Sequence, residues 1–149
     1  MKTLLDLAVG ETLEQPEWQA ISQSMINQFA EATGDHQWIH LDVARCERES
    51  PFKTTIAHGF LTASFMPKAF AQVIAPNERI ASMINYGIDK LRFLEPVKCN
   101  DAVRYQFKLV DVSDKPQGKL FKVEAKCLLK STGNPALIGG FLMLAVLKP

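Results

Sequence analysis

The chain has few of the features that identify large classes of protein. Its three cysteines, Cys46, Cys99 and Cys127, are far apart and form no CxxC pair, so neither a disulfide framework nor a zinc ribbon is indicated. The longest apolar run, residues 137–147, is well below the roughly 18 residues that a membrane-spanning helix needs. Asp6 interrupts the first apolar segment before it reaches the length of a signal peptide. We therefore expect a soluble protein of the reducing cytoplasm that binds no membrane.

The chain also lacks an excess of charge of either sign. Its 17 Lys and Arg residues nearly balance its 16 Asp and Glu residues, and no basic run or stripe is present. We expect no nucleic-acid partner. Internal repeats, low-complexity tracts and linkers are absent as well, and 47% of the 149 residues are hydrophobic. This composition predicts a single globular domain over residues 1–149, with enough apolar material for a core.

Apolar residues from Met25 to Ala30 recur at helical spacing and predict a short amphipathic helix. Ser22 precedes them as a candidate N-cap, and Gly34 follows as a stop signal. Residues 34–55 are polar and contain glycine and proline, which predicts a long irregular connection. Long connections in compact domains are usually functional, so this segment is a candidate site.

Residues 58–74 have almost no polar face, which predicts a helix that the rest of the chain must wrap. Pro67 lies within this segment and should kink the helix, because proline lacks a backbone donor and crowds the preceding turn.

After Arg79 the apolar period changes from helical to the two-residue period of half-buried strands. Strands are predicted over residues 80–94, 103–109, 121–129 and 137–147, with turns at 115–118 and 131–135. One apolar helix followed by four strands predicts an α+β hotdog fold, in which a long antiparallel meander curls around the helix.

Two titratable side chains, Asp35 and His40, lie five residues apart just past the first helix. In an irregular turn after Gly34 both can converge on one water molecule and act as a general acid and base pair. Water addition to a double bond needs that pair, since one proton leaves the attacking oxygen and one reaches the neighbouring carbon. The alternative is structural: Asp35 bonds its own backbone, and His40 is an ordinary polar loop residue.

Gly59 begins the apolar helix and is a candidate oxyanion donor. Without a side chain it exposes its backbone N–H, and the helix dipole favours developing negative charge there. The alternative is that Gly59 only permits close packing. The preceding His58 can likewise be a capping or core histidine.

Other chemistries have weaker support. Metal ligation by Asp35, His36, His40, Asp42 and His58 is an alternative, but Gly34, Trp38 and Ile39 argue that the HxxxH pair lies in a turn and not on one helical face. Nucleophilic hydrolysis is disfavoured, because no GxSxG is present and neither Ser64 nor a cysteine has an evident base. We therefore expect no metal.

The sequence at these positions resembles the MaoC-like family of hotdog dehydratases, which includes the (R)-specific enoyl-CoA hydratases. The segments AEATGDHQWIHLD and TTIAHGFL match the hydratase motif, whose Asp, His and glycine fall on Asp35, His40 and Gly59. The segment INYGIDKLRF resembles the first long strand of bacterial members. With DHQWIH, the chain looks similar to the nodulation protein N-like branch and to related mycobacterial hydratases.

Two positions depart from the family pattern. Many members have Asn-Pro where this chain has Gln37 and Trp38, so an amide remains available while the turn gains a large ring. Some hydratases place a serine in the central helix near the catalytic pair, where this chain has Pro67.

The resemblance implies reversible hydration of a trans-2-enoyl thioester to the (R)-3-hydroxyacyl thioester without a cofactor. It implies catalysis by Asp35 and His40, a substrate carried on CoA or acyl-carrier protein, and a homodimer. Candidate substrate-binding residues are Gly59, Gln37, His58 and Asn85. Two alternatives remain, a non-catalytic acyl-thioester-binding module and a hotdog thioesterase.

Overall fold

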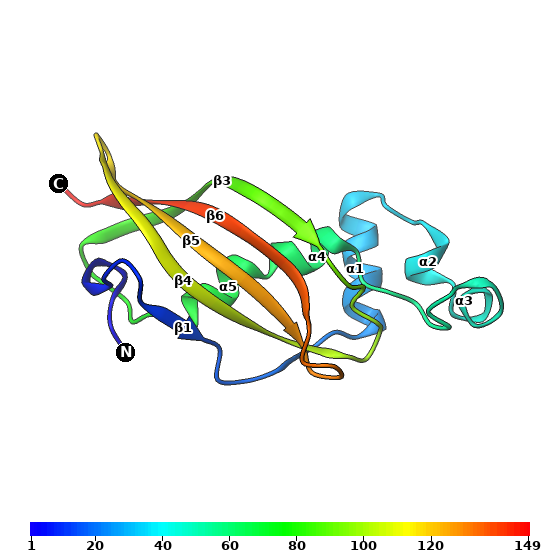
Figure 1. Cartoon of the computed structure of the whole chain (residues 1–149). Helices are drawn as coiled ribbons and strands as arrows, with labels where there is room; N and C mark the ends of the chain where they lie inside the picture. Colours follow the sequence, from blue (N-terminus) through cyan, green and yellow to red (C-terminus); the bar gives the residue numbers. More distant parts are fainter.

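The computed structural model describes residues 1–149, and its main feature is one six-stranded antiparallel sheet that curves around a broken helix (Figure 1). The strands are β1 (Thr12–Glu14), β2 (Gln19–Ala20), β3 (Ile80–Phe93), β4 (Ala102–Lys115), β5 (Gly118–Leu129) and β6 (Pro135–Leu147). The helices are the 3₁₀ turn η1 (Leu4–Asp6) and the α-helices α1 (Gln23–Thr33), α2 (Trp38–Leu41), α3 (Val43–Glu49), α4 (Gly59–Ser64) and α5 (Met66–Ala71). The predicted α+β hotdog fold is confirmed.

The strand order is β1-β4-β5-β6-β3, with β2 also paired to β4. Strands β4, β5 and β6 form the consecutive hairpins that the sequence predicts, and Pro116 and Gln117 make the two-residue turn between β4 and β5. The expected four-strand meander is wrong for β3, which pairs with β6, as Ile84 does with Leu144. The two-residue period reports which face a side chain occupies and not which strand lies beside it, so it does not encode this crossover.

Helix α1 ends where its capping residues predict. The Ser22 hydroxyl oxygen accepts a hydrogen bond from the Met25 N–H at 3.2 Å. Gly34 has a φ of 79° and donates its N–H to the Ala30 carbonyl at 2.8 Å, which closes the helix in the left-handed conformation that glycine tolerates. The direction of the chain entering the candidate site is therefore set by Gly34.

The segment 34–55 was expected to be irregular, but it contains α2 and α3. Asp42 caps α3, because its carboxylate accepts the Arg45 N–H at 3.0 Å. Each helix buries one residue, His40 in α2 and Cys46 in α3, and the remaining positions are polar or partly exposed. A single buried side chain per helix leaves no hydrophobic period to read in the sequence.

The central helix is divided into α4 and α5 at Phe65, close to the predicted kink. Pro67 lies in the first turn of α5, where it cannot donate to the preceding turn. Phe70 of α5 packs edge-on against Phe107 of the sheet, with ring centroids 5.2 Å apart. The buried Tyr105 hydroxyl donates to the Thr62 carbonyl at 2.5 Å and so joins β4 to α4.

Strand β3 forms an edge of the sheet, and residues 81–88 are exposed on both of its faces. Large hydrophobic side chains are exposed along it, namely Met83, Ile84, Tyr86, Ile88 and Phe93, and the neighbouring Phe60 of α4 is 67% exposed. An unpaired edge strand with apolar side chains on both faces is typical of a surface that pairs with another chain. None of the helices is of the length and apolar character that crossing a bilayer requires.

Candidate active site

Four of the predicted site residues, Asp35, His40, His58 and Gly59, come from the helical end of the molecule, where α1 lies next to α4 and α2 and α3 lie farther out (Figure 1). One nitrogen or oxygen atom from each of Asp35, His40 and His58 lies within 4.8 Å of the others. The convergence of Asp35 and His40 that their spacing predicts is therefore present. His58 joins them from a position 23 residues beyond Asp35.

Asp35 lies in the turn between α1 and α2, and this turn is held by local hydrogen bonds. The Asp35 N–H donates to the Thr33 hydroxyl oxygen at 3.3 Å, and the carboxylate Oδ1 accepts the Gln37 N–H at 3.3 Å. The backbone role considered for Asp35 is thus present. It uses one carboxylate oxygen, and the side chain remains 53% exposed.

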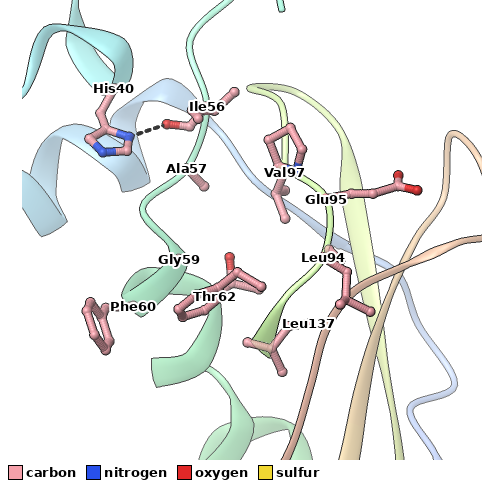
Figure 2. A pocket seen from close by; sticks show the side chains of 13 residues that line it. His40, Ile56, Ala57, Gly59, Phe60, Thr62, Leu94, Glu95, Val97 and Leu137 are labelled. Atoms are coloured by element: carbon pink, nitrogen blue, oxygen red, sulfur yellow. Dashed lines mark hydrogen bonds between the residues drawn. The ribbon is translucent and has the colours of Figure 1, made fainter. Parts of the chain in front are cut away.

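His40 lies in α2 and is 7% exposed. Its Nδ1 is 2.7 Å from the Ile56 carbonyl oxygen, as Figure 2 shows. A carbonyl only accepts, so Nδ1 carries the hydrogen of the neutral ring and Nε2 is left with a free lone pair. Burial lowers the pKa of His40, and the nearby His58 ring lowers it further. The hydrogen bond to the Ile56 carbonyl and the charge of Asp35 act in the opposite direction but are outweighed. At neutral pH the ring can therefore accept a proton.

His58 precedes α4, and its side chain is 3% exposed. Its ring stacks on the His40 ring with centroids 3.8 Å apart and planes 21° apart. Its Nε2 lies 2.9 Å from the Asp35 carbonyl oxygen and 4.0 Å from the Asp35 carboxylate. The side chain thus sits behind His40 and is absent from the lining of the pocket that His40 enters.

A pocket of about 340 Å³ lies between the start of α4 and the segment that follows β3 (Figure 2). His40 and Gly59 line it, together with mostly apolar side chains that include Phe60, Phe93 and Leu137. Glu95 is also in the lining, but its carboxylate points away from His40 in Figure 2 and accepts a hydrogen bond from the Asn134 amide at 3.0 Å. The pocket therefore combines an apolar wall with one buried imidazole.

Gly59 is the first residue of α4, a position whose N–H has no acceptor within its own helix. A Cβ atom here would lie 2.9 Å from the Phe93 ring, so close packing also requires glycine. Both roles considered for Gly59 are compatible with this geometry. Because α4 has only six residues, it has no long helix dipole. Stabilisation of negative charge at this position would therefore come from the Gly59 N–H itself.

The other predicted substrate contacts lie elsewhere. Gln37 is exposed at the start of α2, and the neighbouring Trp38 ring is covered by the Arg45 guanidinium at 4.0 Å. Asn85 lies on β3 and lines a separate hollow beside Phe60. The structure therefore brings Asp35, His40, His58 and Gly59 together, but not the side chains of Gln37 and Asn85.

The sequence did not reveal the hydrogen-bond acceptor of His40 or the stacked imidazole pair. The acceptor is a backbone carbonyl, which every residue has, so the identity of Ile56 carries no signal. The stacking of His58 on His40 depends on how α2 lies against α4, and no periodic pattern records that packing.

The three clustered side chains do not suit a metal ion. A histidine binds a metal in the plane of its ring, and the stacked rings of His40 and His58 cannot both contain one ion in their planes. Moreover, Asp42 caps α3, and His36 pairs with Glu31 at 2.9 Å on the surface. Neither Asp42 nor His36 therefore joins the cluster as a further ligand.

Comparisons with known proteins match most of the chain. The MaoC like domain matches residues 6–130. The chain is 44% identical over 135 residues to 3-hydroxyacyl-thioester dehydratase Z of Mycobacterium tuberculosis, covering 90% of this chain and 88% of that protein. It is 36% identical to nodulation protein N of Rhizobium leguminosarum over 143 residues, covering 95% and 88% respectively. Among solved structures, the unliganded (R)-hydratase PhaJ1 from Pseudomonas aeruginosa is 26% identical and has a TM-score of 0.77, covering 97% of this chain and 85% of that one.

Proposed function

Because this chain belongs to the MaoC-like family, we propose that it catalyses the reversible hydration of a trans-2-enoyl thioester to the (R)-3-hydroxyacyl thioester. The observation that carries the proposal is the clustering of Asp35 and His40 within 4.8 Å, with the buried His40 entering a pocket that Gly59 also lines. An apolar pocket suits an acyl chain, and the two titratable groups suit proton removal from a water that adds to the β-carbon and proton delivery to the α-carbon.

In the proposed reaction, the Asp35 carboxylate and the unprotonated Nε2 of His40 hold one water molecule. As the water oxygen bonds to C3 of the enoyl group, the pair accepts one proton. The pair then delivers one proton to C2 on the same face. One molecule of water is thereby added, and both side chains return to their starting protonation states. The hydrogen bond from His40 Nδ1–H to Ile56 supports this arrangement, since it directs the proton-accepting nitrogen away from the backbone.

The negative charge that develops during the addition accumulates on the thioester carbonyl oxygen. We assign the Gly59 N–H as its hydrogen-bond donor, supported by the position of Gly59 in the pocket wall and by its lack of an acceptor within α4. One such donor is typically worth about 10²- to 10³-fold in rate.

The direct test measures loss of the conjugated enoyl thioester with crotonyl-CoA and longer acyl-CoA substrates. Asp35→Asn and His40→Asn should each lower kcat by about 10²-fold or more, because each removes a proton-transfer group. His36→Ala is the matched control, since His36 belongs to the same segment but is half exposed and pairs only with Glu31. Wild-type activity in both Asp35→Asn and His40→Asn would falsify the assignment.

The same assay separates the two alternative functions. A thioesterase would release a free thiol, whereas hydration releases none. An acyl-thioester-binding module would bind acyl-CoA without turnover at any chain length. Chiral analysis of the product should give the (R)-3-hydroxyacyl thioester, and a parallel series on acyl-carrier-protein thioesters tests the carrier.

We further propose that the protein is a homodimer joined through β3. This strand is the open edge of the sheet, and its exposed apolar side chains lie on both faces. Edge-to-edge pairing of two copies would satisfy the free backbone groups of β3 and cover the apolar side chains around Phe60.

A further inference from the structure

His58 connects three separate parts of the candidate site. Its Nε2 contacts the backbone carbonyl of Asp35, its ring covers the ring of His40, and its own backbone leads directly into Gly59. Phe29 of α1 also packs against the ring, with centroids 4.9 Å apart and planes tilted by 59°. The imidazole is therefore enclosed between α1, α2 and α4.

The contacts of His58 identify its hydrogen-bond donor. The Asp35 carbonyl oxygen can only accept, so Nε2 carries a hydrogen and donates it. Nδ1 is buried and has no hydrogen-bond partner. A buried polar atom without a partner is costly, and an apolar side chain would avoid that cost. His58 also does not cap α4 with its side chain. Packing and capping therefore do not account for an imidazole at this position.

We propose that His58 is a positioning residue, which orients Asp35 through its carbonyl and holds the His40 ring by stacking against it. This inference rests on the proposed function, and it replaces the expectation that His58 contacts substrate. The His58 side chain is 3% exposed, whereas that of Asp35 is 53% exposed, so His58 acts through its two neighbours. A displacement of about 1 Å in such a pair can lower a rate on the order of 10²-fold.

The stack also affects the charge state of the pair. Two imidazole rings with centroids 3.8 Å apart would repel each other if both carried a proton, so His58 lowers the pKa of His40. The other charged groups near them are the Asp35 carboxylate, which favours protonation, and Glu95, whose carboxylate points away across the pocket. His58 therefore opposes the effect of the Asp35 carboxylate on the pKa of His40.

Two variants separate the two contacts. His58→Phe retains a ring to stack on His40 but removes the donor to Asp35, whereas His58→Gln retains an amide donor but removes the ring. Each should lower kcat by about 10-fold or more with KM within about twofold, because positioning is lost and substrate contact is not. His36→Ala, the surface histidine, should change neither constant.

A second measurement needs no substrate. The chain has three histidines, so imidazole NMR of wild type and single variants assigns each one. The titration midpoint of His40 should rise in His58→Phe, where burial is retained but the second imidazole is gone. This readout still tests the positioning role if the chain proves not to hydrate enoyl thioesters.

Several results would overturn the proposal. One is a large rise in KM with unchanged kcat in both variants, which would indicate a substrate contact. Another is wild-type kcat together with an unchanged His40 titration. Loss of cooperative thermal unfolding in both variants would indicate a structural role and would overturn it as well. Wild-type activity in Asp35→Asn and His40→Asn, by contrast, would refute the proposed function. The NMR titration would then still test whether His58 affects His40.

Discussion

Replacement of Gly59 by alanine should lower activity strongly while changing stability little. The new Cβ would lie 2.9 Å from the Phe93 ring, whereas carbon atoms normally approach to about 3.5 Å, so the ring must move by about 0.6 Å. Phe93 is 47% exposed and can move outward. That movement weakens its edge-on contact with Phe60, at a centroid distance of 5.8 Å, which is worth about 0.5–1.5 kcal/mol.

A second effect offsets this cost. Alanine restricts the unfolded chain more than glycine does, which stabilises a helical position by about 0.4–1 kcal/mol. The net change in the free energy of unfolding should therefore be within about 1 kcal/mol. Activity should fall by about 10²-fold, because the methyl group lies beside the N–H that we assign to the substrate carbonyl.

The assays are denaturant unfolding and kcat/KM with an enoyl-CoA. Gly133→Ala is the contrasting control: Gly133 has a φ of 76° with no atom near its added Cβ, so alanine there should cost stability by strain and leave activity intact. Full activity of Gly59→Ala would refute the reasoning that the added methyl group keeps the substrate carbonyl from this N–H. So would recovery of activity in Gly59→Ala combined with Phe93→Ala, because the displaced ring alone would then explain the loss.

Three further predictions concern other parts of the molecule. The acid limb of kcat/KM should have its midpoint below 6.5, because burial lowers the pKa of His40. The unfolded chain then binds the proton more readily than the folded one, so the free energy of unfolding should also fall as pH decreases through 6.5. A midpoint above 6.5 would contradict both expectations. Tyr105→Phe removes the hydroxyl that donates to the Thr62 carbonyl, which then keeps only the Phe65 N–H at 3.3 Å, and should lower the free energy of unfolding by about 1 kcal/mol in denaturant titrations. Tyr86→Asp places a charge on the apolar edge of β3 and should convert a dimer to a monomer in light scattering; a wild-type monomer would contradict the proposed pairing.

The sequence predicted features whose signal is local. Ser22 and Gly34 mark the ends of α1 because capping uses residues next to the helix. Pro67 predicted the break in the central helix for the same reason. The convergence of Asp35 and His40 was also predictable, since five residues of turn keep the two side chains in reach of each other.

Features that depend on distant contacts were not predictable in this way. Strand β3 pairs with β6, and the alternation of its side chains is the same whichever strand lies beside it. The short helices α2 and α3 are stabilised by contacts elsewhere and show no apolar period. The position of His58 behind His40 follows from the packing of α2 against α4, so only the structure distinguishes a pocket residue from one that lies behind the pocket.

All four clustered residues come from one continuous stretch, Asp35 to Gly59, which contributes no strand to the sheet. Backbone hydrogen bonds tie its end to the loop after β3, from Ala57 N–H to the Val97 carbonyl at 2.7 Å and from Cys99 N–H to the Thr55 carbonyl at 2.9 Å. The stretch is thus a helical segment that is attached at its end to the loop after β3. Substitutions within it alter the proton-transfer groups, whereas substitutions at Phe93 and Leu137 of the sheet alter the apolar pocket wall.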